Sequence, residues 1–411
     1  MKYVLFGFLL SLALSISCSN IIQNSDDGVY FNAPELSNIT HWVNSDGFTL
    51  KSKKGKVILI DFYTYTCVNC IRTYPYIKKW HQKYEPYGLV VLGVHSPEFE
   101  FEKKIENIKT SAEFHGLKYP IAVDNKRGTW DAFSNRYWPA KYLIDARGKL
   151  RYSHFGEGYY SETEQQIQEL LIEAGADLSD IPLVQTSEVI STSFFKITGP
   201  ENNLTRELYA GYNRNSLKVR NLKWMNNNSD ESFEGDDSEL VFNRMDDFEN
   251  VLNQPYIVQR NYYDNPLGTI VDYTHDSELI NNFLYITGRW KSKNESLIHG
   301  RETLNFEDNI SLKFCASTAN VVVGKGNNQD PYLIKVTLDG MPIDEVDLGD
   351  DLFIGEDGNT YIQVNEDKMF NIFQSKTSHF DCHKLQISAN SQEFEVFAFT
   401  FSPSTDYVEL Q

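Results

Sequence analysis

The amino-acid sequence predicts an α/β domain followed by an all-β domain. Between residues 55 and 175, buried apolar runs alternate with stretches of helical periodicity. Beyond about residue 180 the helical period disappears, and short runs separated by Gly, Asn and Asp turns replace it. A chain of 411 residues with 41% hydrophobic and 23% charged residues is long and apolar enough to build both cores.

The α/β domain follows from apolar runs and helical faces taken in order. Continuous apolar runs indicate strands covered on both faces. Strands are predicted at 57–63, 89–94, 119–123, 141–144 and 150–155. Apolar residues at helical spacing indicate one helix after Cys70, a second over 101–112 and a third over 161–174. Ser161 and Glu164 fit a capping box that opens the third helix, and Gly175 closes it.

The all-β domain is expected to be a β-sandwich or barrel, because it contains many short strands between turns. Residues 332–338 alternate in polarity and lead into the hairpin signal Asp339-Gly340. Further strands are expected at 256–263, 283–290, 310–316, 319–323, 360–364, 368–374, 383–388 and 394–401. The acidic stretch 225–239 is expected to be a loop. The predicted boundaries are 1–17 for a signal peptide, 18–44 for an N-terminal segment, 45–180 and 207–411 for the domains, and 181–206 for a linker.

The N-terminus reads as an export signal. One lysine precedes an apolar run that ends in small residues before Cys18, and the run is too short for a confident membrane span. Residues 14–18 resemble a bacterial lipobox, which would make Cys18 a lipidated first residue. Ser19 after that cysteine favours the outer membrane. We therefore expect an exported, lipid-anchored protein on the periplasmic side, with ordinary signal cleavage as the alternative.

Charge excludes one class of partner. Lys and Arg number 38 against 57 Asp and Glu, which gives a formal net charge of −19. Nucleic-acid phosphates and anionic membrane surfaces repel such a chain. Nucleic-acid binding is therefore not expected, and membrane contact is expected only through the lipid anchor.

The motif that carries chemistry is Cys67-Val-Asn-Cys70, directly after a predicted buried strand and at the start of a helix. Helix N-terminal amides and the helix dipole stabilise a thiolate at Cys67. The two-residue spacing lets Cys70 resolve a mixed disulfide formed on Cys67. Zinc would need a second ligand pair, and none lies at suitable spacing near this one. A redox-active pair is therefore favoured over a structural disulfide or a metal site.

These features resemble the thioredoxin superfamily. Asp61 stands where that family carries a buried carboxylate that exchanges a proton with the second cysteine, whereas a solvated carboxylate is the alternative. Trp138-Pro139 is similar to the family's cis-proline segment, where a substrate chain docks, and an ordinary trans turn is the alternative. The resemblance implies catalysis by Cys67, Cys70 and Asp61, with Trp138 and Pro139 in substrate docking and no cofactor.

A more specific resemblance covers about 45–180 and 205–402. CVNCIRTYPYI, GLVVLGVHSPEFEFEK and TWDAFSNRYWPAKYLID together are similar to the soluble C-terminal part of DipZ-type thiol:disulfide interchange proteins. In that group a TlpA-like redoxin domain precedes a jelly roll like a carbohydrate-binding module. The resemblance implies reduction or exchange of protein disulfides, with a role in cytochrome c maturation. The electron-delivering membrane domain of that group is not seen here, so a separate donor of the CcdA/DsbD type is expected.

Several other residues are weaker candidates for the site. Thr64 with Arg72 resembles a peroxiredoxin pattern, which keeps a thiol peroxidase as an alternative function. His95 and Glu98 follow the second buried strand and can approach the active site, although exposed loop positions are the alternative. Arg72 and Lys141 could lower the pKa of Cys67 by their charge, or they could lie on solvated faces.

The β-domain offers a second alternative, a surface module that binds a glycan or a protein beside a vestigial redoxin domain. Trp224 and Trp290 are candidates for sugar stacking, against ordinary core packing. Cys315 and Cys382 could form a disulfide or remain buried thiols. His379 and His383 flank Cys382, but three ligands at the edge of one strand make a poor tetrahedral set, so no metal is expected.

Overall fold

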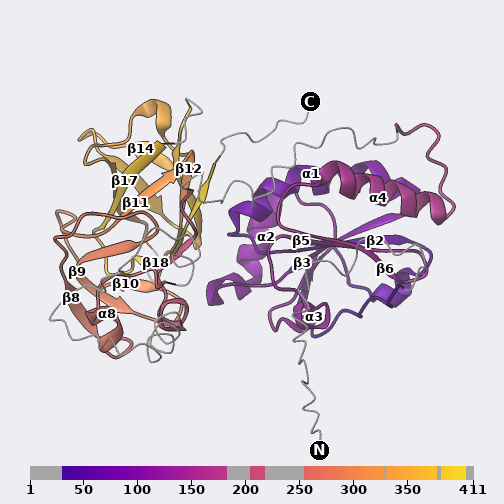
Figure 1. Ribbon diagram of the computed structural model, residues 1–411, viewed down its shortest axis with the longest axis horizontal. Coiled ribbons are helices and arrows are strands. Elements are labelled where there is room, and N and C mark those ends of the chain that lie inside the picture. The colour runs from indigo at the N-terminus through magenta and orange to yellow at the C-terminus, as the bar shows by residue number, and fades with distance from the viewer. Residues whose placement is uncertain (1–29, 183–203, 218–253, 327–329, 377–380, 404–411) are drawn as a thin grey trace, which may run out of the picture.

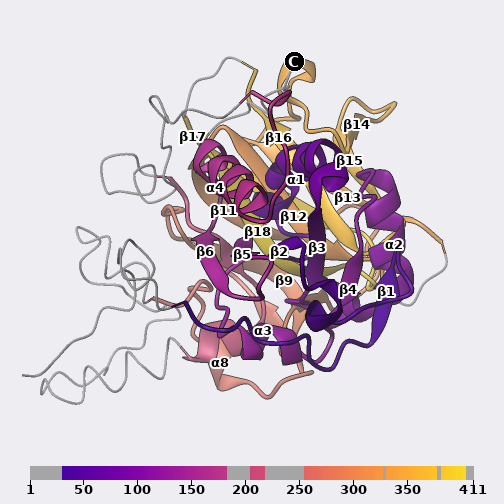
Figure 2. The same ribbon diagram turned by 90° about the vertical axis from the view of Figure 1, so that its right-hand side faces the viewer.

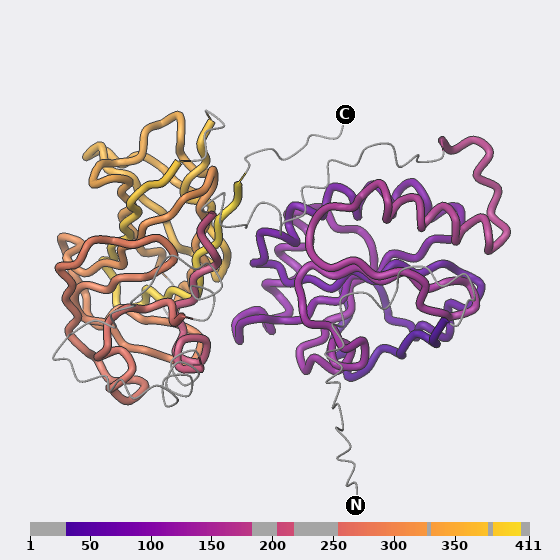
Figure 3. The backbone as a smooth tube through the Cα atoms, viewed as in Figure 1, coloured from indigo at the N-terminus to yellow at the C-terminus, as the bar shows by residue number. Residues whose placement is uncertain are grey.

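The structure, a computed structural model, describes residues 30–182, 204–217, 254–326, 330–376 and 381–403. The predicted signal peptide, Cys18, Trp224, His379, the stretch 225–239 and most of the predicted linker lie outside these residues. The described parts form an α/β domain and an all-β domain, as the sequence predicts (Figures 1 and 3). Within the described ranges, no helix is both long and apolar enough to cross a membrane.

A six-stranded sheet forms the centre of the α/β domain. Its order is β1-β4-β3-β2-β5-β6, and β2, β3 and β4 are parallel to one another. The strands are β1 (His41–Val43), β2 (Val57–Tyr63), β3 (Leu89–His95), β4 (Ile121–Val123), β5 (Ala140–Ile144) and β6 (Leu150–Phe155). Every residue of β2 is buried, because β2 is a central strand covered on both faces.

Helices cover both faces of this sheet (Figures 1 and 2). One core contains apolar residues of α1 (Val68–Tyr84), α2 (Ile105–Phe114) and α4 (Tyr160–Glu173). The opposite core contains α3 (Gly128–Ala132) and apolar residues of the segment that precedes β2. The 3₁₀ helices are η1 (Leu50–Lys53), η2 (Glu85–Tyr87) and η3 (Glu100–Lys103). Residues 30–44, predicted as a separate N-terminal segment, therefore belong partly to this domain, since β1 pairs with β4.

The all-β domain is built from antiparallel strands in two parts, and the long strand β9 takes part in both. The strands are β7 (Leu208–Tyr209), β8 (Ile270–Tyr273), β9 (Leu284–Ser292), β10 (Leu297–His299), β11 (Asp308–Ala316), β12 (Thr318–Gly324), β13 (Tyr332–Leu338), β14 (Leu352–Ile354), β15 (Thr360–Val364), β16 (Lys368–Gln374), β17 (Asp381–Ala389) and β18 (Glu395–Ser402). Short helices α8 (Asn261–Asp264) and η4 (Glu345–Asp347) join them. The first half of β9 pairs with β11, and its second half pairs with β8 and β10.

The two parts of this sheet pack face to face. Phe314 of β11 contacts Phe373 of β16 and Phe401 of β18, with ring centroids 5.6 Å and 5.4 Å apart. The chain changes from one part to the other at Gly288, whose φ is +89°. A Cβ at Gly288 would collide with the Asp308 carboxylate, which binds His299 and Arg301. Glycine is therefore required at this bend for both conformation and space.

Three local predictions are wrong. Residues 256–263 form an isolated bridge at Ile257 and then helix α8, because Tyr262 and Tyr263 turn inward to bond backbone carbonyls. Helix α4 has no capping box: its N-cap is Tyr159 in the left-handed region, and Glu164 instead accepts from Trp80, Lys83 and Tyr84. Thr205 and Arg206, predicted as linker, hydrogen-bond to Cys315 and Asn282 of the β-domain.

Replacing Gly288 with alanine should destabilise the protein by more than the conformational cost of about 1 kcal/mol expected for a left-handed residue. The additional loss comes from displacement of Asp308. Gly358→Ala is the matched control, because Gly358 also has a positive φ of +76° but open space around it. Urea unfolding measures both variants, and equal losses would show that the Asp308 contact is irrelevant.

Candidate active site

The junction of β2 and α1 presents the two cysteines. Cys67 is the N-cap of α1, and its Sγ accepts a hydrogen bond from the Cys70 backbone amide at 3.2 Å. Both are free thiols, Cys67 partly exposed and Cys70 fully buried. The arrangement follows from the sequence, since the buried strand β2 ends at Tyr63 and a short loop leads from it to Cys67 at the start of the helix.

Two buried charges lie behind Cys70. Asp61 of β2 and Lys141 of β5 are paired in the register of neighbouring strands, and neither side chain is exposed. Among the residues described, the two carboxylate oxygens of Asp61 have no hydrogen-bond partner, and the Nζ atom of Lys141 has none either. Burial raises the pKa of Asp61 to about 6, while the Lys141 charge opposes that rise. The alternative positions considered from the sequence, a solvated carboxylate for Asp61 and a solvated face for Lys141, are therefore wrong, because both side chains are buried.

The Cys67 thiol is not in the environment that its helix position alone predicts. Burial raises the pKa of Cys67 above its ordinary value, and the carboxylates of Glu207 and Glu98 raise it further. The hydrogen bond from Cys70 opposes these effects without overcoming them. The pKa of Cys70 is raised well above its ordinary value, mainly by burial. The expected thiolate stabilisation by the helix is therefore outweighed.

Both domains contribute to the surroundings of Cys67. A cavity of about 220 Å³ lies beside Cys67, and residues of both domains line it. The α/β domain contributes Thr66, Cys67, Asn69, Glu98, Phe99, Arg136, Tyr137 and Trp138, and the β-domain contributes Glu207, Tyr209, Arg214, Val322, Ala398 and Thr400. The reactive cysteine therefore faces a cleft between the domains.

Apolar and ionic contacts hold the second domain at this position. Phe99 and Phe101 pack on Phe397 of β18, with ring centroids 5.1 Å and 4.7 Å apart. Lys104 forms an ion pair with Asp367 at 2.8 Å. These contacts come from η3 and its flanks, the segment that follows β3 in the α/β domain.

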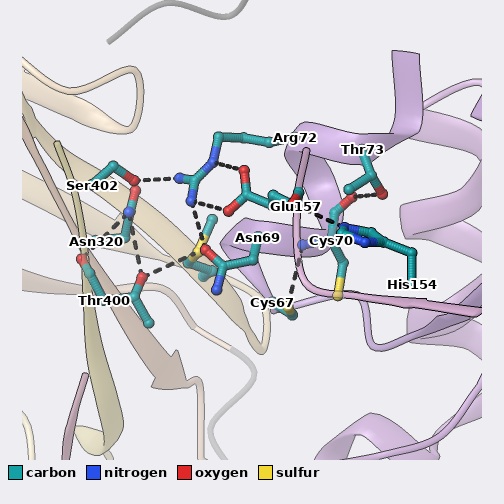
Figure 4. A network of polar contacts seen from close by, with 11 residues as sticks. Cys67, Asn69, Cys70, Arg72, Thr73, His154, Glu157, Asn320, Thr400 and Ser402 are labelled. Carbon is teal, nitrogen blue, oxygen red and sulfur yellow. Dashed lines mark hydrogen bonds and ion pairs between the residues drawn. The ribbon is translucent and has the colours of Figure 1, made fainter. Parts of the chain in front are cut away.

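Arg72 links the cysteine motif to both domains (Figure 4). Its guanidinium donates to both carboxylate oxygens of Glu157 at 2.6 and 2.7 Å, to the Asn69 side chain at 2.5 Å, and to the Ser402 hydroxyl. Asn69 stands between the two cysteines, and Ser402 ends β18. Arg72 therefore links the two domains. Its guanidinium is bound to Glu157, Asn69 and Ser402, whereas the peroxiredoxin pattern would use it at the reactive cysteine.

Two acids from different domains meet in the cleft. Glu98, in the loop after β3, forms an ion pair with Arg214 and accepts from Tyr209 Oη at 3.1 Å. The same tyrosine hydroxyl lies 3.0 Å from Glu207. Burial, together with the nearby Glu98 carboxylate, raises the pKa of Glu207 to about 7. Glu98 thus lines the cavity beside Cys67, whereas Glu207, Tyr209 and Arg214 were not identified from the sequence.

His95 and Thr64 lie beneath the motif and are absent from the cavity lining. His95 is buried, its Nε2 lies 3.4 Å from Thr64 Oγ1, and burial lowers its pKa to about 3. Its ring packs between Tyr63 and Tyr65, so an exposed loop position is wrong for it. Glu102, which sequence reasoning missed, accepts from the Thr66 hydroxyl and from two backbone amides, and so fastens the residue before Cys67 to the η3 loop.

Trp138 and Pro139 lie beside the cleft, and the peptide bond between them is cis. The Trp138 indole donates to the Ser96 carbonyl at 2.9 Å and packs on Trp130 and Arg127. Trp138 is therefore a packed residue that also lines the cavity. Pro139 is buried directly before β5, and its carbonyl accepts from the Gly156 amide at 2.8 Å.

In the β-domain, Cys315 and Cys382 form a disulfide between the paired strands β11 and β17. The Trp290 side chain is fully buried against His299 and Phe394, so it cannot stack on a sugar. Among the described residues, no group of three or more His, Cys, Asp or Glu side chains is arranged to hold a metal ion.

Comparisons with known proteins agree with this geometry. The AhpC/TSA family pattern matches residues 32–153, and the pattern described as a thioredoxin like C-terminal domain matches residues 257–402. Protein DipZ of Mycobacterium tuberculosis is 46% identical over 182 residues, which are 44% of this chain and 25% of that protein. The chain thus spans about a quarter of the DipZ proteins that it matches.

A shorter relative is covered almost completely. Thiol-disulfide oxidoreductase YkuV of Bacillus subtilis is 31% identical over 140 residues, which are 34% of this chain and 94% of that protein. A solution structure of a thioredoxin-like protein in the oxidized form is 31% identical, with a TM-score of 0.33, and the match covers 35% of this chain and 97% of that one.

The pKa of Asp61 should respond to its buried neighbour. Because the Lys141 charge favours the Asp61 carboxylate, Lys141→Met should move the Asp61 pKa from about 6 to a higher pH. The carboxyl ¹³C shift of Asp61 across a pH titration measures this change. Lys126→Met, which removes an exposed charge from the same domain, should leave it unchanged. A lower or unaltered Asp61 pKa in Lys141→Met would refute the coupling.

Proposed function

Because the chain belongs to the thioredoxin-like thiol-disulfide oxidoreductases, we propose that it reduces disulfides of protein substrates through Cys67 and Cys70. The observation that carries this proposal is the pairing of a partly exposed Cys67 at a cleft with a buried Cys70 that lies within electrostatic reach of the buried Asp61. The partly exposed Cys67 thiol can contact a substrate disulfide, whereas the buried Cys70 thiol can react only with Cys67.

The reaction has two steps, formation of a mixed disulfide on Cys67 and its resolution by Cys70. The Cys67 thiolate attacks one sulfur of a substrate disulfide, a mixed disulfide forms, and the displaced substrate sulfur takes up a proton. Cys70 then loses its proton and attacks Cys67 Sγ, which releases the second substrate thiol and leaves the Cys67–Cys70 disulfide. The substrate gains two electrons and two protons. A dithiol protein that acts as electron donor must afterwards reduce the pair again.

Asp61 is proposed as the base for the second step. It lies behind Cys70, has no hydrogen-bond partner of its own among the described side chains, and has a pKa raised by burial to about 6. A base of that pKa is ionised at neutral pH and can accept the Cys70 proton. Since Asp61 holds its own proton below about pH 6, the second step should slow as the pH falls through that value.

The protonation of Cys67 supports reduction as the direction. Strong oxidants of this fold have reduced forms stabilised through a low-pKa thiolate. Here burial and the carboxylates of Glu207 and Glu98 raise the pKa of Cys67, so the reduced form gains no such stabilisation. A pair of this kind gives up electrons more readily than it takes them.

The cellular setting is proposed from the sequence. The lipobox-like signal supports export and a lipid anchor at Cys18, on the periplasmic side of the outer membrane. The resemblance to DipZ-type proteins supports a role in cytochrome c maturation, a separate CcdA/DsbD-type donor and a jelly-roll β-domain. Glycan binding by that domain remains a prediction.

Single cysteine variants should separate the two steps. Cys70→Ser should accumulate a mixed disulfide with a disulfide-containing protein, because Cys67 can still attack and nothing resolves the product. Cys67→Ser, which also removes one sulfur, should form none and should lose turnover. Non-reducing electrophoresis and mass spectrometry identify the adduct. An adduct on Cys70, or retained turnover in Cys67→Ser, would defeat the scheme.

Asp61→Asn should slow resolution of the mixed disulfide by about a hundredfold at neutral pH, which is the usual effect of losing a general base. The first step should be affected much less, since Asp61 lies behind Cys70. Rapid quenching of a single turnover separates the two rates. Asp131→Asn, at an exposed acid of α3, is the control. Equal slowing of both steps would place Asp61 outside the proton transfer.

A further inference from the structure

The cleft beside Cys67 has charged groups on both walls. Glu98, Glu207, Arg136 and Arg214 all line it. Arg214 is taken by Glu98 in an ion pair, so these two charges largely cancel. Arg136 is exposed on the α/β wall, next to Tyr137 and Trp138. Glu207 is the carboxylate that the β-domain presents.

Among the residues that the structure describes, no Lys, Arg or His side chain lies within ion-pair distance of the Glu207 carboxylate. Its Oε2 lies 3.0 Å from the Tyr209 hydroxyl, which Glu98 also contacts. Arg72 and Arg214 act on it only at longer range, and they are held by Glu157 and Glu98. Tyr209 thereby fixes the position of a carboxylate whose charge is left for a ligand.

Carboxylates of the cleft disfavour the thiolate form of Cys67. Burial raises the pKa of Cys67 most, and the Glu207 and Glu98 carboxylates raise it as well. A cation placed beside Glu207 would offset the effect of that carboxylate and lower the pKa of the attacking thiol. The whole chain also carries a net charge of −19, which attracts basic partners over longer distances.

We propose that the cleft selects disulfides flanked by a cationic side chain, and that Glu207 of the β-domain recognises that charge. The cation pairs with Glu207 while Cys67 meets the substrate sulfur, so binding and activation of the thiol occur together. Glu207 is thus a specificity-determining residue supplied by the second domain. This inference rests on the proposed function, because it concerns the substrate of the same cysteine.

The test uses the full chain in its reduced form and synthetic peptides with one internal disulfide. The peptides are identical except that the residues beside the cysteines are Lys, Gln or Glu. Second-order rate constants come from quenched single turnovers, so no electron donor is needed. The Lys peptide should react about fivefold faster than the Glu peptide, which is the discrimination expected of one partly screened ion pair.

Two variants assign the preference to Glu207. Glu207→Gln keeps the shape of the side chain and should bring the ratio of Lys to Glu peptide rates close to one. Glu207→Lys should reverse the ratio. Glu356→Gln removes an equal charge from an exposed turn of the same domain and should keep the full ratio, which separates local recognition from overall charge.

The outcomes distinguish this inference from the proposed function. If the unsubstituted chain reduces all three peptides at equal rates, or if Glu207→Gln keeps the full preference, recognition by Glu207 is overturned while the oxidoreductase activity stands. If no peptide is reduced, the proposed function fails and this inference fails with it. A preference that disappears in Glu207→Gln and persists in Glu356→Gln supports the inference.

Discussion

The packing of the β-domain against the cysteine loop is the constraint on which the rest of the site depends. Phe397 sits on Phe99 and Phe101, and Arg72 reaches across to Ser402 from the helix that carries the cysteines. A lone thioredoxin domain would present Cys67 to solvent, where the helix N-terminus could stabilise its thiolate. Here the second domain closes over that surface, so the thiol is desolvated and shares a cavity with carboxylates.

The buried charges divide the site into two regions. Behind Cys70, Asp61 and Lys141 oppose each other on neighbouring strands, and each reduces the cost of burying the other. In front of Cys67, Glu98 and Glu207 share the Tyr209 hydroxyl across the domain boundary. In the proposed function, Asp61 serves proton transfer at the buried Cys70, and in the further inference Glu207 acts on what reaches the partly exposed Cys67. Glu102 adds a structural carboxylate that holds the loop between them.

The sequence predicts features that depend on local pattern. The position of Cys67 at the start of α1 follows from a buried run ending at a helix, and the burial of Asp61 follows from its apolar flanks. Glu207 and Tyr209 could not be found this way, because they approach Cys67 only through packing of residues more than a hundred positions apart. Glu164 fits a local capping pattern, yet tertiary partners on α1 take its carboxylate instead. Trp290 likewise fits a sugar-stacking pattern in the sequence, but its side chain is fully buried by tertiary packing.

The reduction potential of the Cys67–Cys70 pair in the full chain tests the central claim most directly. Equilibration with dithiothreitol or glutathione buffers, followed by thiol trapping, gives the fraction oxidised at each potential. The account predicts a two-electron couple near that of thioredoxin, about −270 mV, as expected of a reductant whose attacking thiol is not stabilised as a thiolate. A value toward about −120 mV would contradict the reductive direction. The absence of any titratable couple would contradict the oxidoreductase itself.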